Sequence, residues 1–255
     1  MAWCSTRHAA SHHIHSGRTL KASATKRIKK TLISAFVVFI FIVAAFQAYL
    51  FASLIWWRSH NPTTTAFMES RLSLMRQTTP SAKLFFVWIP YGKISENLKR
   101  AVLTSEDDKF VDHDGFDWEG IQKALEKNER RGKVVAGGST ISQQLAKNLF
   151  LSGERSFVRK GQEAVITVMM ESVMDKERIL EIYLNVVEWG DGVFGAEAAA
   201  LHYFGTNAAQ LNASQAARLA AMLPRPRFFD KNRDSPYLAR RAEGIKQRMH
   251  LAQLP

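Results

Sequence analysis

The feature that most constrains this chain is an uncharged hydrophobic run at residues 31–57, TLISAFVVFIFIVAAFQAYLFASLIWW. A helix needs about 20 apolar residues to cross the hydrocarbon core of a bilayer, so this run is long enough to span one. A cleavable signal peptide has a shorter apolar core of about 7–15 residues followed by small residues, whereas this run ends in Ile55, Trp56 and Trp57. The run therefore predicts a transmembrane helix with its tryptophans at the membrane interface.

Basic residues are concentrated before this run. The chain has 35 Lys and Arg against 23 Asp and Glu, a formal net charge of +12. Seven basic and no acidic residues lie within residues 1–30, whereas only Arg58 follows the run directly. The positive-inside rule then predicts a cytoplasmic N-terminus and an extracytoplasmic domain after residue 58.

Several function classes are disfavoured by what the sequence lacks. It has no zinc-ligand spacing, RNP-like motif or Arg-rich recognition helix, so we expect no nucleic-acid partner. The single cysteine, Cys4, excludes an intramolecular disulfide and a cysteine-based zinc site. The histidines of residues 8–15, HAASHHIH, have no acidic neighbour, which favours a solvated segment over a metal site.

The rest of the chain predicts a mainly helical domain with at most a few short strands. Residues 83–90, KLFFVWIP, fit either a short strand or a buried hydrophobic segment. Capping and stop signals predict helices that begin after Ser95, Asp117, Thr140, Gly195 and Asn212, with a further pair separated near Asp175. The predicted organisation is a basic cytoplasmic tail (1–30), a transmembrane helix (31–57), a linker and membrane-proximal segment (58–90) and a mainly helical extracytoplasmic domain (91–255).

The stretch GGSTISQQLAKN, residues 137–148, combines glycines, hydroxyls, glutamines and a lysine. Thr140 and Gln143 form a capping box, and Gly137 and Gly138 permit positive φ or close approach of a ligand. The spacing places Ile141, Leu145 and Leu149 on the core face, with Gln143 and Lys147 on the opposite, accessible face. A helix N-terminus beside a lysine suits an anion, although a polar surface helix explains the same spacing.

Two further stretches carry candidate acids and bases. If the helix before SEDDKFVDHDG, residues 105–115, continues, Glu106 shares a face with Phe110 and His113, and desolvation raises its pKa as a general acid or base requires. The alternatives are a solvated acidic cluster at residues 106–108 and a packed, hydrogen-bonded His113. In RSFVRKGQE, residues 155–163, Glu163 forms either an ordinary i, i+4 salt bridge or part of a diphosphate site with nearby cations.

At these residues the sequence resembles the membrane-anchored peptidoglycan glycosyltransferases, glycosyltransferase family 51, and especially their monofunctional biosynthetic type. The matching segments are EDDKFVDHDG, GGSTISQQLAKN, RKGQE and KERILEIYLN, in the order that the family has them. The resemblance covers residues 62–229. It implies a lysozyme-like, mainly α, two-lobed glycosyltransferase domain whose smaller lobe is partly embedded in the membrane surface.

The resemblance also implies a substrate and a set of roles. The substrate is lipid II, which is polymerised into glycan strands with inversion at MurNAc C1 and release of undecaprenyl diphosphate. Glu106 is then the base for the acceptor hydroxyl, and Glu163 is the second glutamate, near the leaving group, acting through a divalent cation (Mg or Mn) or through basic side chains. The implied substrate-binding residues are Ser139, Gln143, Gln144, Lys147, Asn148, Arg155, Arg159 and Lys160.

Departures from the family pattern set the remaining expectations. The late R-R-x-x-V-L pattern is present only as RRAEGI, residues 240–245, and we assign it no role. The K-T-G motif of a transpeptidase is missing, and the S-x-x-K of note, Ser23 to Lys26, lies in the tail, so we expect no cross-linking activity. The expected location is the bacterial inner membrane with the catalytic domain in the periplasm, and other cell-wall synthesis proteins are candidate partners. The rival hypotheses are a lytic transglycosylase or lysozyme-like hydrolase and a catalytically idle scaffold.

Overall fold

The computed structural model describes residues 16–133, 137–151 and 156–255, the side chains of 16–26 and 28 excepted, and divides into two compact units, Met1–Tyr49 and Leu50–Pro255. The histidine-rich segment and Cys4 lie outside the described residues. Helix α1, Ser16–Trp57, contains a stretch, Lys29–Trp57, that is long and apolar enough to cross a membrane. This fits a single-pass membrane anchor, as the sequence predicts. The helix already begins within the basic tail.

The last turns of α1 belong to the second unit. Leu50 and Leu54 are buried in its core, and the Trp57 ring lies 5.2 Å from that of Phe150. Trp56 is exposed and stacks on His60. Of the two tryptophans expected at the membrane interface, Trp57 therefore packs against the globular unit instead.

The second unit is mainly helical, which confirms the predicted fold class. Its first elements are α2 (Ala66–Thr78), β1 (Phe85–Phe86), η1 (Tyr91–Lys93), α3 (Glu96–Glu106), η2 (Phe110–Asp112), α4 (Trp118–Arg131), α5 (Ile141–Phe150), α6 (Phe157–Val173) and α7 (Lys176–Val186). The later elements are β2 (Glu188–Gly190), β3 (Val193–Phe194), α8 (Ala196–Phe204), η3 (Ala208–Gln210), α9 (Ala213–Met222), α10 (Pro226–Lys231), α11 (Pro236–Arg248) and η4 (Met249–Leu251).

Predicted caps bound these helices. The side chains of Ser95, Asp117 and Asp175 accept hydrogen bonds from the first turns of α3, α4 and α7, and Asn212 forms a capping box with Gln215 at α9. Gly205, with φ of 62°, ends α8. The N-terminal ends were predictable because a short polar side chain satisfies an N–H group that has no partner within its own helix. Trp118 and Leu125 of α4 are 72% and 65% exposed, so they do not belong to the core.

The strands form one small sheet in the order β1-β3-β2. β1 runs parallel to β3, pairing Phe85 with Val193 and Phe86 with Phe194, and β2 runs antiparallel to β3. The segment at residues 83–90 therefore contains a strand of two residues.

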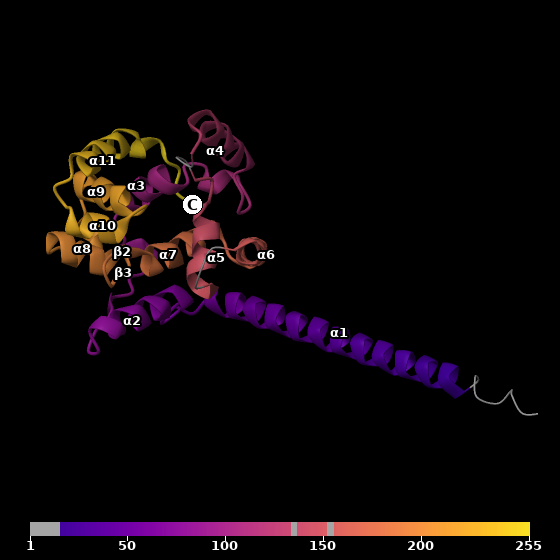
Figure 1. Ribbon diagram of the computed structural model, residues 1–255. Helices are drawn as coiled ribbons and strands as arrows, with labels where there is room; N and C mark the ends of the chain where they lie inside the picture. Colours follow the sequence, from indigo (N-terminus) through magenta and orange to yellow (C-terminus); the bar gives the residue numbers. More distant parts are fainter. Residues whose placement is uncertain (1–15, 134–136, 152–155) are drawn as a thin grey trace, which may run out of the picture. The chain divides into compact units, whose positions relative to one another are not determined.

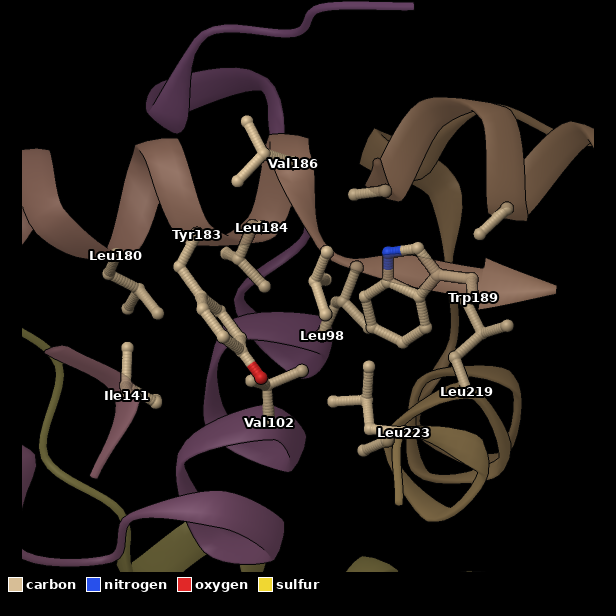
Figure 2. Close-up of a cluster of buried hydrophobic side chains, with 14 of the residues drawn as sticks. Leu98, Val102, Ile141, Leu180, Tyr183, Leu184, Val186, Trp189, Leu219 and Leu223 are labelled. Atoms are coloured by element: carbon tan, nitrogen blue, oxygen red, sulfur yellow. The ribbon is translucent and has the colours of Figure 1, made fainter. Parts of the chain in front are cut away.

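Helix α7 lies at the centre of the hydrophobic core. In Figure 1, α8 to α11 gather on one side of the second unit and α4 and α6 on the other, with α5 and α7 between them. Figure 2 shows the Tyr183 ring reaching from α7 toward Ile141 of α5 and Val102 of α3, and the Trp189 ring beside Leu219 and Leu223. All but one of these side chains are fully buried. The core thus holds α3, α5 and α7 in one rigid group.

Gly195, which joins β3 to α8, tolerates no side chain. It has φ of 86° and ψ of 157°, and an added Cβ would lie 2.5 Å from the Asn185 carbonyl oxygen. That backbone region is almost exclusive to glycine, and strain of this kind costs about 1–3 kcal/mol before the clash is counted. We expect Gly195→Ala to destabilise the domain by about 3 kcal/mol, a fall in Tm of about 6–12 °C for a domain of this size.

The matched control for this prediction is Gly205→Ala. Gly205 also has positive φ, 62°, but an added Cβ meets nothing within 4 Å. A left-handed residue without a clash costs about 1–2 kcal/mol, so its Tm should fall by only about 2–8 °C, less than that of Gly195→Ala. Thermal unfolding of the detergent-solubilised variants measures both values, and equal falls would show that the Asn185 contact is unimportant.

Candidate active site

Glu106 is the last residue of α3. The helix does not continue, because Asp107 leaves it with φ of −165° and ψ of 78°. The expectation that Glu106, Phe110 and His113 share one helical face is therefore wrong. Phe110 instead lies in the turn η2, where its buried ring packs edge-on against the His113 ring at 6.3 Å.

The Glu106 carboxyl is nonetheless largely buried, with 12% of its side chain exposed. The Ser105 hydroxyl lies 3.1 Å from Oε1, and the Gln144 amide donates to Oε2 at 3.0 Å. Burial raises the pKa of Glu106, while these two hydrogen bonds and the charge of Arg241 oppose the rise. The predicted rise in pKa by desolvation is confirmed, although the desolvation comes from tertiary packing and not from Phe110 on the same helix.

Asp107 links this segment to the start of α5. Its Oδ2 accepts the Ile141 N–H at 2.9 Å, and its Oδ1 lies 2.9 Å from His113 Nε2. The alternative of a solvated acidic cluster therefore fails for Glu106 and Asp107, and only Asp108 is exposed. The expectation of a packed, hydrogen-bonded His113 is confirmed. Because Asp107 occupies the first N–H of α5, this N–H is not free for an anion.

The capping box of Thr140 and Gln143 is present as predicted. Ile141, Leu145 and Leu149 are buried, but so is Gln143, at 4% exposed. The prediction that Gln143 is accessible is wrong. Its side-chain oxygen accepts a hydrogen bond from the Thr140 N–H, at 3.1 Å, as part of the capping box. Lys147 is half-buried.

The second of the two glycines before α5, Gly138, serves contact with another helix. Neither Gly137 nor Gly138 has positive φ. A Cβ on Gly138 would lie 3.0 Å from the Ile121 Cα, so this glycine lets the chain pass close to α4.

Gln144 connects the core to Glu106. The buried Tyr183 hydroxyl donates to Gln144 Oε1 at 3.0 Å, which leaves the amide nitrogen pointing at Glu106. A donor on the oxygen side fixes which end of the amide faces the carboxylate. Gln144 therefore orients Glu106 through a hydrogen bond that begins in the core.

Glu163 lies on α6 and is 3% exposed. Lys160 donates to its Oε1, and Arg159 Nη1 lies 3.7 Å from Oε2. Lys160 Nζ also lies 3.5 Å from the Ser139 hydroxyl. The helical salt bridge expected as one alternative is present, and it is more than a surface pair because Glu163 is buried against two cations beside Ser139.

Two cavities contain the predicted residues. The first, of about 240 Å³, is lined by Glu106 and Ser139 together with Asp107, Asp117 and residues 137–140. The second, of about 620 Å³, is lined by Gln144, Lys147, Asn148 and Glu188, with Arg225 and Arg227 from the α10 segment. Gln144 lines the second cavity and donates to Glu106 in the first.

Most of the predicted site residues thus line these two cavities or contact residues that line them. Glu106 and Ser139 share one cavity, Arg159, Lys160 and Glu163 adjoin it through Ser139, and Gln144, Lys147 and Asn148 line the other. Gln143 is a cap inside α5, and Arg155 lies outside the described residues.

Sequence reasoning missed several residues that line these cavities or contact their walls. Arg241 of α11 donates to the Ser105 hydroxyl at 3.0 Å and lies 4.0 Å from Glu106 Oε1. It belongs to RRAEGI, the degenerate motif to which we assigned no role, so the paired arginines were the available signal. Arg225 and Arg227 stand in a proline-rich turn with no spacing that marks them.

The residues around Glu163 do not fit a divalent cation site formed by the protein. Both carboxylate oxygens lie against cationic side chains, and within the described residues no group of three or more His, Cys, Asp or Glu side chains could hold a metal ion. Mg²⁺ and Mn²⁺ prefer several oxygen ligands. The groups beside Glu163 that suit an anion are therefore basic side chains.

Comparisons with known proteins agree with this geometry. The family model described as Transglycosylase matches residues 74–250. A biosynthetic peptidoglycan transglycosylase of Herminiimonas arsenicoxydans is 60% identical over 230 residues, which cover 90% of this chain and 100% of that protein. Proteins of the same name from Janthinobacterium sp. (strain Marseille) and Azoarcus sp. (strain BH72) are 59% and 56% identical, over 90% and 89% of this chain and 100% and 96% of theirs.

The matched segment, residues 74–250, contains every predicted site residue, and the relatives' names specify synthesis of peptidoglycan. The rival hypotheses of a lytic enzyme and of an idle scaffold are accordingly set aside. The chain belongs to the transglycosylase family and is a peptidoglycan glycosyltransferase.

Proposed function

We propose that this enzyme polymerises lipid II into glycan strands at the outer face of the bacterial inner membrane. The observation that carries the proposal is the buried Glu106 carboxyl in a cavity whose wall, at Ser139, adjoins the Glu163–Lys160 pair. A desolvated carboxyl suits proton transfer near neutral pH, and fixed cations suit a diphosphate leaving group.

In the proposed reaction Glu106 accepts the proton of the 4-hydroxyl of the acceptor GlcNAc. The hydroxyl oxygen forms a bond to C1 of the terminal MurNAc of the growing chain, and the bond from C1 to the diphosphate oxygen breaks. The electron pair of that bond leaves with undecaprenyl diphosphate, and C1 inverts from α to β. The proton stays on Glu106 until solvent or the departing product removes it.

Basic side chains stabilise the charge that develops on the diphosphate. Arg159 and Lys160 are held by Glu163, and we assign Arg155 to the same group from its place in the motif. Ser139 and Asn148 bind the sugar and phosphate oxygens of the substrates. Lys147, together with Arg225 and Arg227, lines the second cavity, which gives the second substrate's diphosphate a cationic surface of its own.

The tail and α1 indicate how the enzyme sits in the membrane. We propose that the basic residues of the tail lie in the cytoplasm, that α1 crosses the bilayer once, and that the second unit works in the periplasm. Without a K-T-G motif the enzyme makes glycan but does not cross-link its peptides. Other proteins of cell-wall synthesis are its proposed partners.

The deciding experiment gives labelled lipid II to the purified full-length protein in detergent. We expect muramidase-sensitive strands and release of undecaprenyl diphosphate, without peptide cross-links. Release of anhydro-muropeptides or reducing sugars from preformed sacculi, with no polymer from lipid II, would overturn the proposal.

A further inference from the structure

Arg241 is the one guanidinium beside Glu106 in the described part of the chain, and it comes from an element remote in sequence. Helix α11 packs against α3 and α9 through its buried residues Leu238 and Ile245. From this helix Arg241 Nη2 reaches the Ser105 hydroxyl at 3.0 Å and lies 4.0 Å from Glu106 Oε1. The Ser105 hydroxyl also lies 3.1 Å from the Ala220 carbonyl of α9, so three helices meet at this point.

The guanidinium has little else to pair with. Among the ion pairs of the described residues, Glu106 is its carboxylate partner, and its Nε is buried without a hydrogen bond to any described group. Arg100, by contrast, donates to the Ala252 carbonyl and pairs with the exposed Glu96 on its own helix. Arg241 instead keeps its charge beside a single buried acid.

We propose that Arg241 is a positioning residue, which holds Glu106 ionised and fixed in direction so that the carboxylate can accept the acceptor proton. The inference rests on the proposed role of Glu106 as the base. Arg241 donates to Ser105, whose hydroxyl contacts Glu106 Oε1, and its positive charge attracts the same oxygen. Gln144 donates to Oε2, so both carboxylate oxygens of Glu106 are held in position. A fixed carboxylate retains the geometry that proton transfer requires.

The other groups facing Glu106 explain why a cation is needed there. Asp107, on the same segment, repels the ionised carboxylate, and burial disfavours it further. Tyr183 of α7 is neutral, because burial and the charges of Glu106 and Asp107 raise its pKa. Ser105 and Gln144 are uncharged donors. Arg241 is thus the formal positive charge that favours the ionised base.

The test is the pH dependence of kcat/KM for lipid II polymerisation by full-length variants. In Arg241→Gln the acid limb should move to higher pH by about one unit, which is the lower end of the effect of one opposite charge on a carboxyl. Activity on the acid limb then falls about tenfold, while the alkaline plateau and the KM for lipid II change little. Arg241→Lys, which keeps the charge, should restore most of the limb.

Arg240→Gln is the matched control, since Arg240 is the exposed neighbour on the same helix. If R241Q is too unstable to assay, as judged by its Tm, Arg241→Met keeps the apolar stem and gives the same comparison. A loss equal at every pH, or a rise in KM alone, overturns the inference, since it indicates structural support or substrate contact. If E106Q retains activity, Glu106 is not the base. If E106Q is inactive but the acid limb of the pH profile does not move in R241Q, only the proposed role of Arg241 is refuted.

Discussion

Replacing Glu106 with glutamine is expected to abolish glycan polymerisation. Glutamine keeps the shape of the side chain, but it cannot accept the proton of the attacking hydroxyl. Loss of a general base typically costs about 10²–10⁴ in rate, and here the residual activity should be near the lower limit of detection. The measurement is single-turnover consumption of labelled lipid II by the full-length enzyme, with Tm as the check on folding.

The fold of E106Q should survive. Removing a buried charge relieves the desolvation that raises the pKa of Glu106, although one hydrogen bond with Gln144 must be rearranged. Glu96→Gln is the matched control, because Glu96 lies at the other end of α3 and its side chain is 72% exposed. If E106Q polymerised lipid II at a rate close to that of E96Q, Glu106 would not be the base.

Replacing Glu163 with glutamine should lower kcat by about 10²-fold, the range observed when one preorganised electrostatic group is lost from an active site. The carboxylate holds Lys160 next to Ser139 and lies against Arg159. Without it these cations repel one another and leave the positions in which they stabilise the diphosphate. The KM for lipid II should change less than kcat, since the effect falls on the developing charge.

Glu171→Gln provides the comparison for this variant. Glu171 is also on α6 and is also paired with a lysine, Lys176, but it lines neither cavity. Both variants lose a largely buried carboxylate that is paired with a lysine, so both should lose stability. Only E163Q should lose turnover at a temperature at which both remain folded, and parallel losses in kcat would mean that Glu163 is structural.

Local signals allowed the helices to be predicted with their ends. The boundaries at Thr140, Asp175 and Asn212 follow from hydrogen bonds that involve only neighbouring residues. The same reasoning failed at Asp107, where the helical spacing predicted continuation. There the chain leaves the helix to meet the Ile141 N–H, a contact that sequence spacing does not reveal.

Candidate residues were predictable where a motif kept them close together. Glu163, Arg159 and Lys160 lie within one turn of α6, so their pairing follows from helical periodicity. The accessibility of Gln143 was mispredicted, because periodicity indicates which residues share a face but not what covers that face.

By itself, the sequence determined the apolar run of α1, the helical class of the domain, and the family through four motifs in order. These depend on composition and short-range spacing, which the chain carries whether or not it is folded. Tertiary structure alone decided that Glu106 is desolvated, that the Tyr183–Gln144 hydrogen bonds orient it, and that Arg241 lies beside it. The physical reason is that burial and charge act through space, and α3, α5, α7 and α11 meet only when the core has packed.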